Sequence, residues 1–142
     1  MKTYVDTSFL ISLYSLDANS GAALQTMSRS AGDHIISTLG ELEAVNALEL
    51  RVFRHEITRA QAQGSWDALI SDLRDGVFQL RSLPEQSFER AQLLSRQTTA
   101  RLGVRTADLL HIAAALELGA GRLFSFDQQQ RKLAQSVHLK VN

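Results

Sequence analysis

The sequence predicts an α/β fold, a three-layer α/β/α sandwich around a mostly parallel central sheet. Short β-forming runs alternate with longer segments of helical periodicity, and parallel strands need such helices as connections. A chain of 142 residues suits one domain, so we expect residues 1–142 to fold as a single unit. A content of 44% hydrophobic and 21% charged residues is typical of a globular protein with its own core.

The first third of the chain contains two predicted strands and three predicted helices. The run KTYVD favours a strand over residues 2–6, and the apolar segment TSFLISLY favours a helix over 7–14. A second helix is expected over 18–30, and HIIS predicts a strand over 34–37. Helical spacing then predicts a helix over 39–54, with an apolar face formed by Leu42, Val45, Leu48 and Val52.

Capping boxes, in which a polar residue and a Glu or Gln three positions later bond each other's backbone, indicate further helix starts. Four pairs have this spacing: Thr38 with Glu41, Thr58 with Gln61, Ser82 with Glu85, and Asp127 with Gln130. The second pair opens a predicted helix over 58–73 and the third a helix over 82–102. A strand is expected between them over 77–80.

The last third of the chain continues the same alternation. An apolar helix is predicted over 106–118 and ends at a glycine, Gly119. A strand over 122–126, a helix over 128–135 and a final strand over 138–141 complete the expected elements.

Composition excludes several classes of protein. Without cysteine there is no disulfide, thiolate metal site or cysteine nucleophile. No apolar run approaches the ~18 residues of a membrane span, and the first hydrophobic segment contains Asp6, which argues against a signal peptide. We therefore expect a cytoplasmic protein. Fifteen basic residues, twelve of them arginine, balance fifteen acidic ones, so a polyanion would have to be held by locally placed arginines or by a metal.

Common cofactor and nucleophile motifs are also missing. The GAG at residues 119–121 follows a helix and lacks the third glycine of a dinucleotide site. There is no phosphate-binding GxxxxGK[ST] loop and no GxSxG nucleophile elbow. The four histidines lack metal-ligand spacing, and His111, within LLHIAAA, is expected to be a packed helix residue.

Four acidic residues remain as candidates for chemistry: Asp6, Glu43, Asp108 and Asp127. Asp6 and Asp127 end predicted strands, and ligands of parallel sheets bind beyond the carboxyl ends of strands. Three of the four also suit the start of a helix, where a carboxylate caps the backbone or faces the positive end of the helix dipole. Glu43 lies about 200° around its helix from Glu41, the expected capping residue, so Glu43 requires another partner.

Short motifs along nearly the whole chain resemble those of PIN-domain nucleases. The segments VDTSFL, ELEAVNAL, RTADLLHIAAALELG and LFSFD occur in the order and spacing of that family. In length and compactness the chain is similar to the VapC-type toxin ribonucleases of bacterial toxin–antitoxin pairs. The resemblance implies a PIN-like fold, an RNA substrate, a cognate antitoxin protein as partner and a homodimer.

The resemblance also implies roles for particular residues. The acidic quartet of the family corresponds to Asp6, Glu43, Asp108 and Asp127, as catalytic residues and metal ligands. Further positions match small polar residues of the family: Thr7 or Ser8, Asn46 and Ser125. Arg105 and His111 flank the third acid in forms that vary within the family, so the resemblance assigns them no firm role. Arg105 is nonetheless the arginine nearest in sequence to one of these acids, Asp108. We therefore expect it to lie at the mouth of the site, where it can contact a substrate phosphate.

Electrostatics agrees with a metal at such a cluster. Two carboxylates about 5 Å apart repel by roughly 3 kcal/mol at an effective dielectric near 20, so the cluster must hold protons or a cation. Oxygen ligands without cysteine favour Mg²⁺ or Mn²⁺. The sequence thus predicts a metal-dependent endoribonuclease. Two alternatives stay open: an interaction module whose acids only cap helices, and an aspartate-based phosphatase, although DTSF lacks the DxDx[TV] motif of such enzymes.

Overall fold

The computed structural model describes residues 1–142 and contains a five-stranded, all-parallel sheet. The strand order is β3-β2-β1-β4-β5, so β1 lies at the centre, paired with both β2 and β4. The strands are β1 (Thr3–Val5), β2 (His34–Ser37), β3 (Gln79–Arg81), β4 (Arg122–Phe124) and β5 (Lys140–Val141). Because β1 is central, residues that follow it lie in the middle of the carboxyl edge of the sheet.

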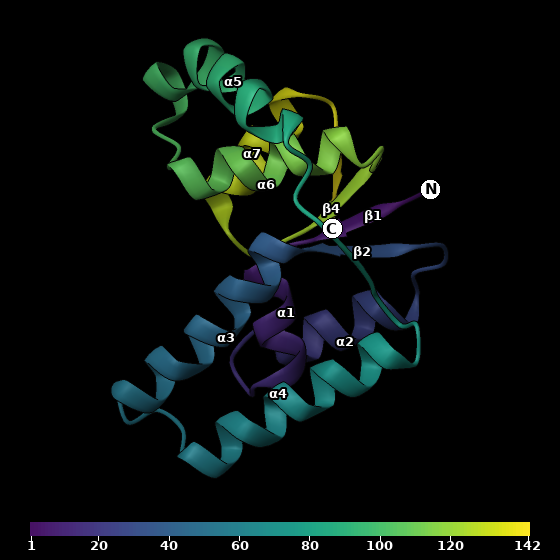
Figure 1. The fold of residues 1–142 in the computed structure, drawn as a ribbon, viewed down its shortest axis with the longest axis vertical. Helices are drawn as coiled ribbons and strands as arrows, with labels where there is room; N and C mark the ends of the chain where they lie inside the picture. Colours follow the sequence, from purple (N-terminus) through teal and green to yellow (C-terminus); the bar gives the residue numbers. More distant parts are fainter.

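Seven helices cover the two faces of the sheet. They are α1 (Thr7–Tyr14), α2 (Ser20–Ser28), α3 (Thr38–Phe53), α4 (Arg59–Arg74), α5 (Gln86–Leu102), α6 (Thr106–Glu117) and α7 (Gln128–Ser136). Figure 1 shows α5, α6 and α7 on one side of the sheet and α1 to α4 on the other. This arrangement confirms the predicted three-layer sandwich.

The two faces of the sheet bury two separate hydrophobic clusters. Tyr4 and Leu123 point into the cluster beneath α5, α6 and α7, and both side chains are fully buried. Their neighbours Val5 and Phe124 point into the cluster beneath α1 to α4. Alternate residues of a strand face opposite sides, so the strands of a sheet covered on both faces are continuously apolar. None of the helices is long and apolar enough to cross a membrane.

Most predicted elements are present, with differences at their ends. α1 and β2 have the predicted bounds. α2 begins at Ser20 because a turn around Asp17, whose backbone N–H donates to the Ser20 hydroxyl, precedes it. β4 ends at Phe124, and β5, at the edge of the sheet, pairs with β4 over two residues only.

One of the predicted capping boxes is complete. Thr58 accepts from the backbone N–H of Gln61, and the Gln61 side chain accepts from the backbone of Thr58. At Asp127 half of the box forms: its carboxylate accepts from the backbone of Gln130, while its own N–H donates to a serine hydroxyl, Ser125 Oγ.

Two predicted capping boxes are wrong. At α3 the cap is Ser37, which accepts from Gly40, whereas the Thr38 hydroxyl accepts from the distant backbone N–H of Leu83. At α5 the helix begins at Gln86 and no side chain caps it. At α3, the Thr38 hydroxyl that would accept a hydrogen bond in a local capping box accepts one from a residue far along the chain instead.

Candidate active site

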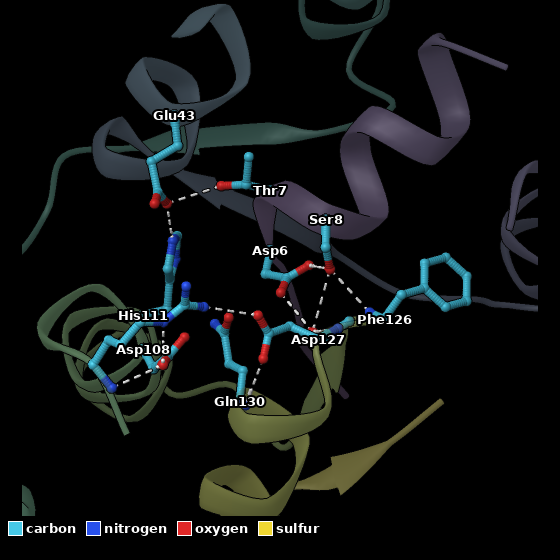
Figure 2. Close-up of polar contacts among 11 residues, drawn as sticks. Asp6, Thr7, Ser8, Glu43, Asp108, His111, Phe126, Asp127 and Gln130 are labelled. Carbon is cyan, nitrogen blue, oxygen red and sulfur yellow. Dashed lines mark hydrogen bonds and ion pairs between the residues drawn. The ribbon is translucent and has the colours of Figure 1, made fainter. Parts of the chain in front are cut away.

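The carboxyl edge of the sheet opens into a cleft of about 690 Å³. The four acids singled out by the sequence all line it: Asp6, Glu43, Asp108 and Asp127. They come from four different elements, the end of β1, the first half of α3, the first turn of α6 and the start of α7. Figure 2 shows these side chains approaching one region from different helices and strand ends.

Asp6 lies at the bottom of the cleft and is 1% exposed. Its carboxylate caps α1 by accepting from the backbone N–H of Phe9 at 3.0 Å. Two hydroxyls also donate to it, Ser8 at 2.7 Å and Ser125 at 2.5 Å. Burial raises the pKa of the Asp6 carboxyl, although these hydrogen bonds and the nearby His111 act to lower the pKa. An ionised Asp6 is therefore costly unless a cation comes close to it.

Asp108 lies in the first turn of α6 and is 3% exposed. Its Oδ2 atom accepts from the backbone N–H of Arg105 at 3.0 Å, which makes Arg105, and not Thr106, the cap residue of the helix. The Oδ1 atom of Asp108 has no hydrogen-bond partner in the protein. One oxygen of this carboxylate thus accepts the hydrogen bond that caps the helix, and the other is free to bind a ligand in the cleft.

Arg105 bridges two of the acids. Its guanidinium lies 3.4 Å from Asp108 and 3.1 Å from Asp127, atom to atom, while its side chain remains 73% exposed. The pKa of Arg105 is raised above its ordinary value, first by the charge of Asp108 and its hydrogen bond, then by Asp127. A cation thus already balances part of the acidic charge, and a metal ion would compete with it.

Ser125 connects Asp6 to Asp127, and Ser8 connects Asp6 to Phe126. Besides bonding Asp6, the Ser125 hydroxyl accepts from the backbone N–H of Asp127 at 3.0 Å. The Ser8 hydroxyl accepts from the backbone N–H of Phe126 at 2.9 Å. The structure therefore brings both serines into the site, as positioning groups for Asp6.

Glu43 reaches the cleft from α3 and is held through one oxygen. Its Oε1 atom accepts from the Thr7 hydroxyl at 2.9 Å and contacts Nε2 of His111. Burial acts to raise the pKa of Glu43, but the contacts with His111 and Thr7 prevail and hold the pKa below its ordinary value. Glu41 does not line the cleft, and it does not form the predicted capping box with Thr38 either.

Two outcomes at the site differ from the sequence analysis. Asn46 is exposed and does not line the cleft, so the structure does not bring it to the acids. His111 is packed within α6, as the sequence suggested, but it also lines the cleft and contacts Glu43. The available signal was its position three residues after Asp108, which places both side chains on neighbouring parts of one helix face.

The chemistry of the acids suits a divalent cation, although the conformation here is not that of a formed metal centre. No three carboxylate or imidazole groups lie close enough together to hold an ion as they stand. The donors are nevertheless oxygen atoms of the kind that Mg²⁺ and Mn²⁺ prefer, and Oδ1 of Asp108 and Oε2 of Glu43 carry no protein hydrogen bond. Asp6 and Asp127 complete a set of four carboxylates around the same space.

Solved structures with the same fold include bacterial toxins. VapC20 of Mycobacterium tuberculosis, a toxin that cleaves the sarcin–ricin loop, has a TM-score of 0.71 and 19% identity, covering 92% of this chain and 93% of its own. VapBC2 of Rickettsia felis, bound to a promoter DNA fragment, has a TM-score of 0.67 and 14% identity, covering 100% and 98%. VapBC-1 of nontypeable Haemophilus influenzae has a TM-score of 0.63 and 16% identity, covering 100% and 97%.

At these identities the likeness establishes the fold. No curated protein sequence matches the chain. The family model of the PIN domain, in contrast, matches residues 3–136, almost the entire length. The match includes all four cleft acids and the strands and helices that carry them. The chain belongs to the PIN domain family.

Proposed function

We propose that this protein is an endoribonuclease that depends on Mg²⁺ or Mn²⁺ and hydrolyses RNA phosphodiester bonds. The observation that carries the proposal is the convergence of four carboxylates, from four separate elements, on one cleft at the carboxyl edge of the sheet. Helix capping alone does not account for Glu43, which lies within α3 and caps nothing. Membership of the PIN domain family supports nuclease chemistry at these acids.

The acids have different tasks in this proposal. A bound divalent cation would neutralise the phosphodiester and supply an acidified water as nucleophile. Asp6 and Asp108, which are almost fully buried, provide fixed oxygens for such an ion. Glu43 and Asp127 are more exposed, at 32% and 27% of their side chains, and would complete the set of oxygen ligands around the ion.

The shape of the cleft supports a single RNA strand as substrate. One face of α3 lines it lengthwise, through Glu43, Ala47, Leu50, Arg51 and Arg54. Eleven residues of helix separate Glu43 from Arg54, a distance of about 16 Å that a few nucleotides of one strand would span. Arg54 is exposed and has no ion pair, unlike Arg51 and Arg105. In our proposal Arg54 contacts a phosphate upstream or downstream of the one that is cleaved.

We further propose that the protein is the toxin of a type II toxin–antitoxin pair, with an antitoxin protein as its partner and a homodimer as its assembly. Support comes from the fold of the VapC and VapBC proteins and from a toxin–antitoxin complex of Klebsiella pneumoniae, which has a TM-score of 0.63 and 16% identity. A small DNA-binding-type protein encoded beside this chain would agree with the proposal, and co-purification of the two proteins would test it.

An RNA cleavage assay tests the nuclease function directly. We expect the purified protein to cleave RNA with Mg²⁺ or Mn²⁺, to leave a 5′-phosphate and a 3′-hydroxyl, and to stop when EDTA is added. Undiminished cleavage in EDTA would exclude the metal mechanism. Absence of any divalent-ion binding would favour an interaction module, and release of phosphate from a monoester without RNA cleavage would favour a phosphatase.

A further inference from the structure

A buried chain of hydrogen bonds leads from the start of α3 to Glu43. The Ser37 hydroxyl caps α3 by accepting from Gly40 N–H, and its oxygen lies 2.6 Å from the Tyr4 hydroxyl. The Tyr4 hydroxyl lies 2.8 Å from Nδ1 of His111, whose Nε2 contacts Glu43. Ser37, Tyr4 and His111 are 0%, 0% and 2% exposed, so water does not compete for these bonds.

The direction of each bond follows from counting protons. The Glu43 carboxylate can only accept, so Nε2 of His111 carries a proton. When Nδ1 accepts from Tyr4, Tyr4 accepts from Ser37, and Ser37 accepts from Gly40. Every hydroxyl then donates once, and no buried hydrogen lacks an acceptor.

The Tyr4 phenol keeps its proton, because burial raises its pKa, although its Ser37 hydrogen bond acts to lower the pKa. The buried hydroxyls of Tyr4 and Ser37 therefore hold the Nδ1 side of the His111 ring in place, and the Nε2 side faces Glu43.

The same bonds select which oxygen of Glu43 is used. His111 and Thr7 both contact Oε1, and Oε2 has no hydrogen bond within the protein. Gly40, in the first turn of α3, lies near the ring: an added Cβ would be 3.9 Å from His111 and 3.2 Å from the Ile36 side chain of β2. Figure 2 shows Glu43 between Thr7 and His111.

We infer that His111 is a positioning residue whose imidazole, protonated at Nε2 and held by Tyr4, fixes Oε1 of Glu43 and leaves Oε2 to a divalent cation. This inference rests on the proposed function in one respect, the cation. The position of the proton and its dependence on Tyr4 concern the metal-free protein alone. Groups that orient a metal ligand commonly change metal affinity by 10- to 100-fold when they are removed.

The first test is a two-bond ¹H–¹⁵N spectrum of the metal-free protein with ¹⁵N-labelled histidine. The four histidine rings can be assigned with His111→Gln as the reference that lacks one of them. We expect the His111 ring to show a protonated Nε2. A ring without a proton at Nε2 would overturn the inference.

The second test measures the affinity for Mg²⁺ by calorimetry. His111→Leu should weaken binding by about 10- to 100-fold, whereas His111→Gln, whose amide can still donate to Glu43, should recover most of the loss. Tyr4→Phe should cause a smaller loss, and none when added to His111→Leu, because it acts through the ring. An affinity of His111→Leu within twofold of the original, or additive losses in the double variant, would overturn the inference.

A control separates positioning from general destabilisation. Leu94→Ala removes a buried side chain of α5 that packs on α6 and does not line the cleft. It should lower the melting temperature without changing Mg²⁺ affinity. If the unaltered protein binds no divalent ion at all, the proposed function fails, while the nitrogen spectrum still decides where the His111 proton lies.

Discussion

The two ends of the cleft are built in different ways. At the acidic end the carboxylates of Asp6 and Asp108 are buried, and each also bonds the backbone at the start of a helix. At the other end Arg51 and Arg54 extend from the last turns of α3, where Arg51 bonds Asp17 and Ser15 and Arg54 is free and exposed.

This difference matches what each end has to do in the proposed reaction. Ligands of a metal must stay within a fraction of an ångström of one geometry, and burial with backbone hydrogen bonds achieves this. A flanking phosphate needs only a nearby positive charge, and the guanidinium that supplies it does not have to be held in one exact position. Substitutions at the acidic end should therefore act on the chemical step, and those at the arginine end on RNA affinity.

The largest effect is expected at Glu43. Glu43→Gln removes a charged oxygen and should lower kcat/KM for RNA by at least about 10²-fold, because charge stabilisation by a metal is worth several kcal/mol. Glu41→Gln, two residues away and outside the cleft, is the matched control and should keep its activity. Cleavage kinetics of both purified variants, with circular dichroism to confirm the fold, provide the measurement. Equal losses in the two variants would contradict the assignment of Glu43.

Arg54→Ala should weaken RNA binding by severalfold, with little change in kcat. One lost phosphate contact lowers the slope of log affinity against log salt by about 0.7 for a single strand. Arg96→Ala is the control, since Arg96 is exposed on α5 and does not line the cleft. Affinities would be measured over a range of salt with Ca²⁺ as a non-catalytic ion. An unchanged slope for Arg54→Ala would show that RNA does not extend along α3.

Asp6→Asn should stabilise the metal-free protein at neutral pH by about 1 kcal/mol, or roughly 3–5 °C in melting temperature. Burial raises the pKa of Asp6 in the native state, so the folded chain binds this proton more tightly than the unfolded chain. Stability then falls as pH rises through the interval between the ordinary and the raised pKa. Asparagine can still cap α1, and it has no negative charge whose burial would destabilise the folded state.

Thermal melts of the Asp6→Asn variant at several pH values test this expectation. The advantage of the variant should disappear at acid pH, below the ordinary pKa of an aspartate, and the stabilisation by Mg²⁺ should shrink. A large fall in melting temperature without metal would instead show that Asp6 is mainly a structural cap.

The smallest effect is expected for the stability of Arg105→Ala. The Arg105 guanidinium is 73% exposed to solvent, although its partner Asp108 is buried, so losing the two ion pairs should lower the free energy of unfolding by only a few tenths of a kcal/mol. If Arg105 also contacts a substrate phosphate, the salt slope of RNA binding should fall as for Arg54→Ala. Denaturant melts and salt titrations of the same sample distinguish the two roles, and an unchanged slope would leave Arg105 as a partner of Asp108 and Asp127 only.

Local features of the sequence were sufficient for much of the fold. The bounds of α1 and β2, the complete box at Thr58 and the capping by Asp6 and Asp127 all depend on residues within four positions of one another. Apolar periodicity and short-range hydrogen bonds determine such features, so they can be predicted from the sequence. The alternation of strands and helices then led to the three-layer arrangement.

The contacts that make the acids into one site depend on the tertiary structure. Parallel pairing of β1 with β4 brings Ser125 to Asp6, 119 residues apart in the chain, and the fold brings Glu43 of α3 to His111 of α6. The hydroxyl of Ser37 likewise caps α3 and bonds Tyr4 at the same time. The sequence by itself determined which acids stand at the ends of strands and the starts of helices, because those positions follow from local backbone geometry. Only the tertiary structure decided which side chain holds each acid, because such partners are selected by the pairing of strands and the packing of helices that lie far apart in the chain.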